Sequence, residues 1–333
     1  MTAMIDLPTI ADVAAAAGRL AGSAVRTPLL ENADLNARVG GRVLIKPETL
    51  QRTGSFKFRG AGNKIAKLMQ AGERPQTILA YSSGNHAQGV AAAARLAGLS
   101  ALIVMPDDAP AIKIENTRAL GAEIVFYDRR TEDREAITEL LLRERGGTLV
   151  RPYDDPDVIA GQGTVGLEIA EQAHERGAVV DHVLVPCGGG GLTSGIALAL
   201  SGASPKTRVH PVEPEGFDDT RRSLATGKIL GNEPGATSFC DALLAPRPGA
   251  LTFALNSRLV GEGFAVTDAE TTAAMAFAFR TLKLVVEPGG AVALAAVLAG
   301  KIDCRKRTIC IVLSGGNADP AIFCRAVGGP PPT

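Results

Sequence analysis

Short apolar runs alternate along the chain with longer, Ala-rich stretches of helical character. The runs have the length of β-strands, and most of the stretches between them have the length of helices. Such alternation is typical of parallel sheets with helices on both faces, so the pattern predicts an α/β fold. The expected strands are 42–46, 77–81, 101–105, 123–127, 148–150, 181–186, 208–213 and 307–313. The expected helices are 9–22, 56–72, 85–97, 163–176, 191–201, 268–282 and 290–299, with two more beginning near 111 and 132.

The strands and helices between Thr77 and Val150 form a compact βαβαβαβ pattern within the longer alternation. A unit of this kind is a small parallel sheet with helices of its own. We therefore expect a small domain at 77–151, carried by a larger domain made of 1–76 and 152–333. The length of 333 residues is sufficient for two such domains.

Composition narrows the classes of partner. The chain has 35 Lys and Arg against 35 Asp and Glu, so no basic excess predicts a nucleic-acid partner. No apolar run approaches the roughly twenty residues that cross a membrane, and the N-terminus lacks the pattern of a secretion signal. The five cysteines match no zinc-binding spacing. We expect a cytoplasmic protein that binds neither nucleic acid nor membranes.

The sharpest candidate for chemistry is Lys57, in the segment from Thr53 to Gly60 that reads TGSFKFRG. It follows a glycine at the point where a loop is expected to enter a helix. A lysine shielded from water there has a lowered pKa, and its neutral amine is able to attack an aldehyde. Taken alone, the segment fits a solvated lysine better, and Lys46, Lys64 and Lys67 are rival candidates.

Four consecutive glycines, Gly188 to Gly191, lie between an expected strand and an expected helix. Glycines let backbone N–H groups close around a phosphate, and the N-terminus of a helix favours its charge. The Gly-x-Gly-x-x-Gly fingerprint of a dinucleotide site fails, because Thr193 or Ser194 takes its last position. The loop favours a phosphate monoester over a dinucleotide. A turn that serves only packing is the remaining alternative.

Two polar turns also follow expected strands. The first is Ser82-Ser83-Gly84-Asn85-His86, whose hydroxyls and N–H groups suit a carboxylate, although a simple helix cap explains them as well. The second is Ser314-Gly315-Gly316-Asn317, at the end of the last strand. A small hydroxyl there suits a ligand crevice, and an ordinary strand-to-turn serine is an equal alternative.

The order and spacing of these four segments resemble the fold type II pyridoxal-phosphate enzymes, in their serine/threonine dehydratase and serine racemase branch. The resemblance extends from Arg26-Thr-Pro-Leu-Leu through Asn317. Further matches are Ala160-Gly-Gln-Gly-Thr164 and Glu287-Pro288. The resemblance implies a tryptophan synthase β-like fold of two parallel-sheet domains, with pyridoxal 5'-phosphate in the cleft between them.

The resemblance implies a role for each matching residue. Lys57 would hold the cofactor aldehyde, and Ser83 would face the substrate Cα from the side opposite the lysine. Asn85 would bond the ring hydroxyl, and Ser314 the pyridine nitrogen. The residues implied to contact the cofactor are Phe56, Lys57, Asn85, Gly188, Gly189, Gly190, Gly191, Leu192, Glu287 and Ser314. Those implied to frame the substrate are Ser82, Ser83, Asn85 and His86.

The implied reaction is a β-elimination that converts a β-hydroxy amino acid, such as L-threonine or L-serine, to a 2-oxo acid and ammonia. A serine or aspartate racemase and a 3-hydroxyaspartate dehydratase are the alternatives within the family. A dinucleotide-dependent oxidoreductase would use the glycine loop without Lys57, and a sensor would bind ligand without turnover. The family often has Asp-Gly where this chain has Asp241-Ala242, so the substrate stays open.

An acidic stretch matches the divalent-cation site of the racemase branch. The resemblance implies Glu213, the carbonyl of Phe217 and Asp219 as ligands of Mg²⁺ or Ca²⁺, and a solvated acidic loop is the alternative. Little chain follows Asn317, so we expect no C-terminal regulatory domain. We also expect a homodimer or homotetramer.

Overall fold

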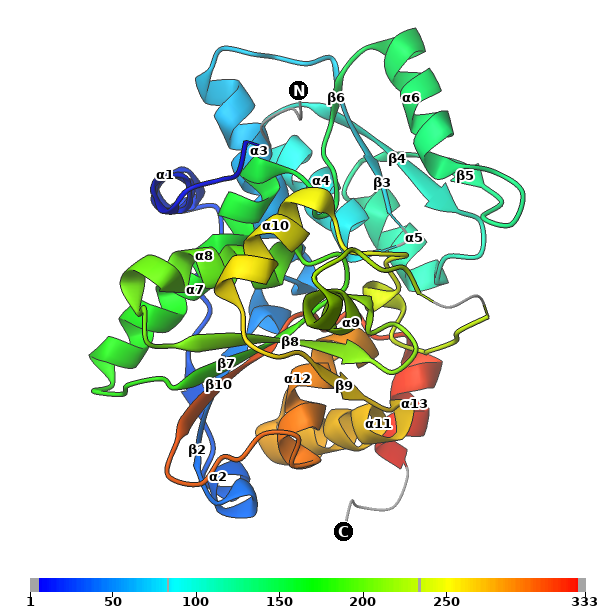
Figure 1. The fold of residues 1–333 in the computed structure, drawn as a ribbon. Coiled ribbons are helices and arrows are strands. Elements are labelled where there is room, and N and C mark those ends of the chain that lie inside the picture. Colours follow the sequence, from blue (N-terminus) through cyan, green and yellow to red (C-terminus); the bar gives the residue numbers. More distant parts are fainter. Residues whose placement is uncertain (1–5, 83, 233–234, 329–333) are drawn as a thin grey trace.

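The protein is described by a computed structural model that places residues 6–82, 84–232 and 235–328. Two β-sheets form the framework, and Figure 1 shows the smaller one above the larger one. This is the α/β arrangement of parallel sheets and helices that the sequence predicts.

The larger sheet has six strands in the order β1-β2-β10-β7-β8-β9. Strand β1 runs antiparallel to β2, and the remaining pairs are parallel. One face is covered by apolar side chains of α2, α11, α12 and α13, and the other by those of α7 and α8. The strands are β1 (Leu30–Glu31), β2 (Arg42–Pro47), β7 (His182–Pro186), β8 (Arg208–Pro214), β9 (Phe264–Val266) and β10 (Thr308–Leu313). The helices are α1 (Ile10–Leu20), α2 (Ala33–Val39), α7 (Pro156–Glu175), α8 (Gly191–Ala203), α9 (Asp219–Thr226), α10 (Ala250–Leu259), α11 (Asp268–Phe277), α12 (Pro288–Leu298) and α13 (Pro320–Gly328).

The smaller sheet has four parallel strands in the order β5-β4-β3-β6. Helices α3, α4 and α5 pack on one face, and α6 packs on the other. The strands are β3 (Thr77–Tyr81), β4 (Ser100–Pro106), β5 (Glu123–Tyr127) and β6 (Thr148–Leu149). The helices are α3 (Lys57–Gln70), α4 (Asn85–Leu96), α5 (Ala111–Ala119) and α6 (Arg134–Arg145).

The domain boundary near residue 76 stays a prediction. Helix α3, which precedes this boundary, contacts both units. Phe58, Ala61 and Ile65 of this helix share a core with Ile78 and Val90 of the smaller unit. At the same time, Asn63 and Lys64 of α3 bond Asp157 of α7. Helix α3 therefore joins the two sheets rather than belonging to one of them.

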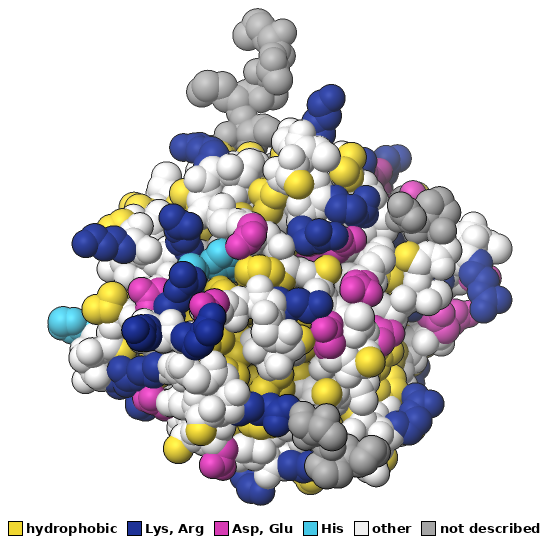
Figure 2. Space-filling model, turned by 60° about the horizontal axis from the view of Figure 1, so that its bottom comes forward, with side chains coloured by type: hydrophobic (Ala, Val, Ile, Leu, Met, Phe, Trp, Pro, Cys, Tyr) yellow, Lys and Arg dark blue, Asp and Glu magenta, His cyan; other side chains and the backbone are white. Residues whose placement is uncertain are grey.

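Charges are interspersed over the surface. On the face shown in Figure 2, Lys and Arg side chains alternate with Asp and Glu side chains around apolar areas. Among the described residues, no helix combines the length and the apolar character needed to cross a membrane. The expected cytoplasmic location and the expected homodimer or homotetramer stay predictions.

Candidate active site

Four chain segments meet in a cavity of about 150 Å³ between the two sheets. They are the turn before α3, the β3–α4 turn, the β7–α8 glycine loop and the end of β10. Three of these segments follow the carboxyl ends of parallel strands, where ligand crevices of α/β sheets are found. The lining comprises Phe56, Lys57, Tyr81, Ser82, Gly84, Asn85, His86, Lys113, Arg134, Pro152, Tyr153, Pro186, Gly188–Leu192, Asp241–Ala245 and Ser314.

Lys57 begins α3 with its amine in this cavity. The Nζ atom donates a hydrogen bond to the carbonyl of Pro152 at 2.7 Å and lies 5.2 Å from the centre of the Phe56 ring. Among the described residues, Lys57 forms no ion pair with Asp or Glu. Burial lowers the pKa of Lys57 to about 8, because desolvation disfavours the ammonium ion. A substantial fraction of this amine is therefore neutral and nucleophilic near physiological pH.

The glycine loop leaves the N-terminus of α8 open to an anion. Gly190 precedes the helix with φ of 92°, and no side chain caps the first turn. A Cβ atom on Gly189 would lie 2.4 Å from the Tyr153 ring, so only glycine fits there. The Thr193 hydroxyl is buried beside the Cys187 thiol and makes no close hydrogen bond among the described residues. An uncapped helix N-terminus behind a glycine loop fits a phosphate group.

The turn after β3 contributes uncharged polar groups. His86 Nε2 donates to the Val150 carbonyl at 2.8 Å, since a carbonyl oxygen only accepts. Burial and the nearby Lys57 amine lower the pKa of His86 to about 3, so the ring stays neutral. Ser82 and Asn85 also line the cavity. The remaining residue predicted in this turn, Ser83, lies outside the described residues.

The end of β10 is fastened to the turn before Lys57. The Phe56 N–H donates to the Ser314 carbonyl at 3.1 Å, and Ser55 pairs with Gly315 in an antiparallel bridge. These backbone bonds hold Ser314 and Lys57 in the wall of one cavity.

A charged network crosses the cavity from the smaller sheet to the larger one. Lys113 of α5 forms an ion pair with Asp241, and its Nζ lies 3.7 Å from the Glu287 carboxylate. Glu287 in turn accepts a hydrogen bond from the Asn85 amide nitrogen. Burial raises the pKa of Glu287 to about 7, although the Lys113 charge opposes this shift. Glu287 is absent from the cavity lining, so it supports Asn85 from behind.

Arg134 is another basic residue of the lining, besides Lys57 and Lys113, and lies at the start of α6. Its guanidinium carbon lies 4.9 Å from the centre of the Tyr81 ring. It forms no ion pair with any described Asp or Glu, unlike Lys113. Apart from Lys57, the predicted attachment point of the cofactor, Arg134 is therefore the cation of this lining that no described carboxylate compensates.

Comparison with known proteins identifies the family. A family model described as "Pyridoxal-phosphate dependent enzyme" matches residues 20–315. The chain belongs to this family of fold type II enzymes. It is 45% identical over 315 residues to an L-threo-3-hydroxyaspartate ammonia-lyase of Pseudomonas sp, covering 95% of this chain and 97% of that protein. It is 40% identical to an L-threo-3-hydroxyaspartate ammonia-lyase of Saccharomyces cerevisiae, covering 97% of each. The crystal structure of a threonine deaminase from T.th. superposes with a TM-score of 0.88 at 44% identity, over 94% of this chain and 99% of that one.

The residues of this pyridoxal-phosphate enzyme suit the cofactor of its family. The open N-terminus of α8 fits the phosphate, and the buried Lys57 amine fits the aldehyde. Apart from Glu287 and the undescribed Ser83, each residue predicted to bind cofactor or substrate lines the single cavity. Their individual contacts with a cofactor stay predictions.

The lining residues that sequence reasoning missed include Lys113, Arg134 and Tyr153. Lys113 and Arg134 belong to helices α5 and α6, and neither has a glycine or serine motif beside it. Tyr153 precedes the Asp155 cap of α7, a helix expected to begin seven residues later than its start at Pro156. The only sequence signal for Arg134 is the N-cap residue Asp133, which marks a helix start without indicating a site.

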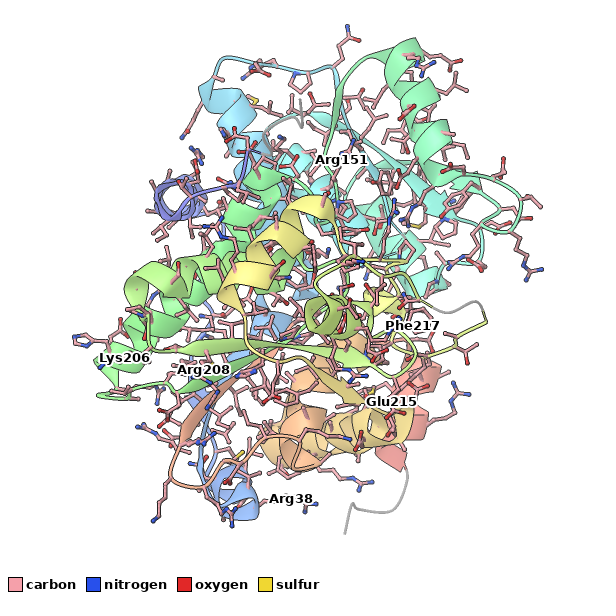
Figure 3. The ribbon with its side chains drawn as sticks, in the orientation of Figure 1. Arg38, Arg151, Lys206, Arg208, Glu215 and Phe217 are labelled. Atoms are coloured by element: carbon pink, nitrogen blue, oxygen red, sulfur yellow. The ribbon has the colours of Figure 1, made fainter. Side chains whose placement is uncertain are left out.

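The predicted cation ligands also lie together, outside this cavity. Glu213 and Asp219 are fully buried, and the Glu213 carboxylate accepts the Thr220 and Arg221 N–H groups at 2.9 and 2.7 Å. The Asp219 carboxylate makes no close hydrogen bond among the described residues. Burial raises the pKa of Asp219 to about 7, although the Asn232 side chain and the Asp219 N–H interact with the carboxylate and act to lower its pKa. Burial also raises the pKa of Glu213, and the nearby Asp219 charge raises it further. Figure 3 labels Phe217 on the loop between them.

Proposed function

We propose that this protein is a pyridoxal-phosphate-dependent ammonia-lyase that eliminates water from a β-hydroxy amino acid. The observation that carries the proposal is the partly buried Lys57 amine with its lowered pKa, in one cavity with the open N-terminus of α8. When bound, the cofactor supplies an electron sink that makes the Cα proton of an amino acid acidic. The enamine released after elimination would hydrolyse to a 2-oxo acid and ammonia.

Lys57 is the proposed base that removes the proton from Cα. Its lowered pKa suits this task, because a base works best when its pKa lies near the working pH. The Pro152 carbonyl accepts a bond from Nζ and so orients the amine within the cavity. Phe56 covers the amine on one side and limits its contact with water.

The remaining predicted residues would bind and orient the two ligands. We propose that Asn85 contacts the ring hydroxyl of the cofactor and Ser314 its pyridine nitrogen. Ser82, Asn85 and the neutral His86 would frame the substrate carboxylate through hydrogen bonds. Ser83 remains a predicted residue for proton transfer on the opposite face of Cα, which racemisation would require.

We infer that the preferred substrate is a dicarboxylate, L-threo-3-hydroxyaspartate, rather than threonine or serine. Lys57 is reserved for the cofactor in this proposal, which leaves Arg134 as the lining cation without a carboxylate partner among the described residues. A guanidinium binds a carboxylate with two parallel hydrogen bonds. Lys113 is less suited to this role, because it is 2% exposed and paired with Asp241. Two of the relatives, at 45% and 40% identity, carry this substrate in their names, whereas another at 40% identity is named L-threonine ammonia-lyase.

Replacing Arg134 with Gln tests this substrate directly. We expect kcat/KM for L-threo-3-hydroxyaspartate to fall at least about thirtyfold, or ~2 kcal/mol, because a charge-assisted contact is lost. The values for L-serine and L-threonine should change no more than about threefold. The assay measures 2-oxo acid and ammonia together for the three amino acids.

Arg151→Gln is the matched control. Arg151 lines a neighbouring groove and is exposed, and Figure 3 shows it close to the smaller sheet. Its removal changes the net charge equally and should affect the three substrates alike. An equal loss for all three amino acids in Arg134→Gln would refute recognition of a distal carboxylate. A wild-type enzyme that prefers serine or threonine would refute the proposed substrate.

We also propose that Glu213, Asp219 and the Phe217 carbonyl bind Mg²⁺ or Ca²⁺. The Asp219 carboxylate, which is fully buried without a close hydrogen bond among the described residues, supports this, since buried carboxylates are usually well paired or bound to metal. Hard cations of this kind take oxygen ligands and complete their coordination with water. The site would act on stability, because it is separate from the cavity lining.

A further inference from the structure

Asn317 joins the two segments that hold the cavity's key polar groups. It follows β10 within the loop from Ser314, and its Nδ2 atom donates two hydrogen bonds. One goes to the backbone carbonyl of Thr53 at 2.7 Å, and the other to Oδ1 of Asn85 at 2.8 Å. Both hydrogens of this amide nitrogen are therefore used.

The Thr53 carbonyl determines which way both amides point. A carbonyl oxygen only accepts, so the atom of Asn317 that faces Thr53 must be the nitrogen. The same nitrogen faces Asn85, so Asn85 must turn its oxygen toward Asn317. The nitrogen of Asn85 is then directed away from Asn317, where one of its hydrogens bonds Glu287.

The turn that supplies this carbonyl is held in an unusual conformation. Thr53 has a φ of 60°, in the left-handed region that β-branched residues rarely enter. Gly54 also has a positive φ, and a Cβ atom there would lie 2.7 Å from Oδ1 of Asn317. Its carbonyl accepts the Gly316 N–H at 2.9 Å. The turn and the loop around Asn317 thus fix each other, and the Thr53 carbonyl cannot turn away freely.

We propose that Asn317 is a positioning residue that orients the Asn85 amide so that its nitrogen is available to the ring hydroxyl of the cofactor. The inference rests on the proposed function, in which Asn85 contacts that hydroxyl. A donated hydrogen bond favours the ionised oxygen, whereas a carbonyl oxygen in the same place would repel it. Among the described residues, two contacts fix the direction of the Asn85 amide: the bond it accepts from Asn317 and the bond it donates to Glu287. Loss of Asn317 would leave Glu287 alone to hold that direction.

A double-mutant cycle on cofactor affinity tests this role. The dissociation constant of pyridoxal phosphate is measured by reconstituting the cofactor-free protein, for the wild type, Asn85→Ala, Asn317→Ala and the double variant. We expect Asn317→Ala to raise the constant at least about tenfold in the wild type and less than about twofold in the Asn85→Ala background. Contacts that act through one another are non-additive in this way.

Asn317→Asp nearly keeps the shape of the side chain but removes both donated hydrogen bonds, to the Thr53 carbonyl and to Asn85. Because an Asp only accepts, it favours an Asn85 turned with its nitrogen toward position 317 and its oxygen toward the cofactor. We expect it to weaken cofactor binding at least as much as Asn317→Ala. Equal effects of Asn317→Ala in both backgrounds would overturn the proposal and leave Asn317 as a brace for the Thr53 turn. An Asn85→Ala variant with unchanged affinity would instead refute the proposed contact of Asn85, and the proposal with it.

Discussion

At the scale of single residues, two buried carboxylates are not explained by the reaction. Glu213 accepts two backbone N–H groups, whereas the oxygens of Asp219 accept no close hydrogen bond among the described residues. Both are fully buried, so their charges would repel each other in a medium of low dielectric constant. A divalent cation between them would remove this repulsion and bind only the folded protein.

Removal of the cation should therefore lower the melting temperature. We expect a chelator to destabilise the wild type and Mg²⁺ or Ca²⁺ to restore it, because a ligand of the native state shifts unfolding by mass action. Glu213→Ala should abolish this response. The control is Glu215→Gln, an exposed acid on the same loop that Figure 3 labels, which should respond like the wild type. If neither chelator nor cation changes the melting temperature of metal-free protein, the proposal is wrong and the segment is a loop without a cation.

Lysines show how far residue types alone predict a site. Lys46 and Lys57 are comparable candidates in the sequence, and both are shielded from water. In the structure, the Lys46 amine donates hydrogen bonds to Glu168, Gln172 and the Thr27 carbonyl. Glu168 lies more than one hundred residues from Lys46 in the sequence, so no local motif predicts this contact.

At the scale of elements, the N-terminus of α10 is capped by a residue from a loop distant in the sequence. Asp154 accepts the backbone N–H groups of Ala250, Leu251 and Thr252 at 3.1, 2.8 and 3.3 Å. The Thr252 hydroxyl then donates to the Gly189 carbonyl at 2.7 Å. The cap of this helix therefore also supports the glycine loop.

Asp154→Ala should affect both stability and the phosphate site. We expect a loss of about 1–2 kcal/mol in the free energy of unfolding, as for other lost helix caps, measured by denaturant titration. Cofactor affinity should fall several-fold as the glycine loop loosens. Asn32→Ala, which removes the cap of α2, should cost similar stability and leave affinity unchanged. A comparable change of affinity in both variants would argue against the link from α10 to the loop.

The same helix shows why some elements escaped prediction. Its cap comes from a residue nearly one hundred positions earlier, so the sequence before Ala250 shows no capping residue. Helix α11 ends at Phe277, and a π-helical turn over Ala278–Leu282 replaces its expected continuation. By contrast, β3, β5 and α4 match their expected positions closely, because apolar periodicity and polar turns define them locally.

At the scale of the whole molecule, the four motifs were predictable as a set, but their supports were not. The glycine loop, the Lys57 turn, the β3–α4 turn and the Ser314 loop each follow local rules, and the structure brings them to one cavity. The Lys113–Asp241 pair and the Asn85–Glu287 bond connect the two sheets through residues more than one hundred positions apart. These contacts depend on the packing of the sheets, which local sequence does not encode.

The central claim is that Lys57 binds the cofactor in this cavity. Borohydride reduction of the cofactor-loaded protein, followed by peptide mapping, locates the lysine that carries the cofactor. We predict a single modified peptide containing Lys57, because its amine, whose pKa is lowered, faces the cavity beside the open N-terminus of α8. Modification of Lys46, Lys113 or another lysine in its place would contradict the account.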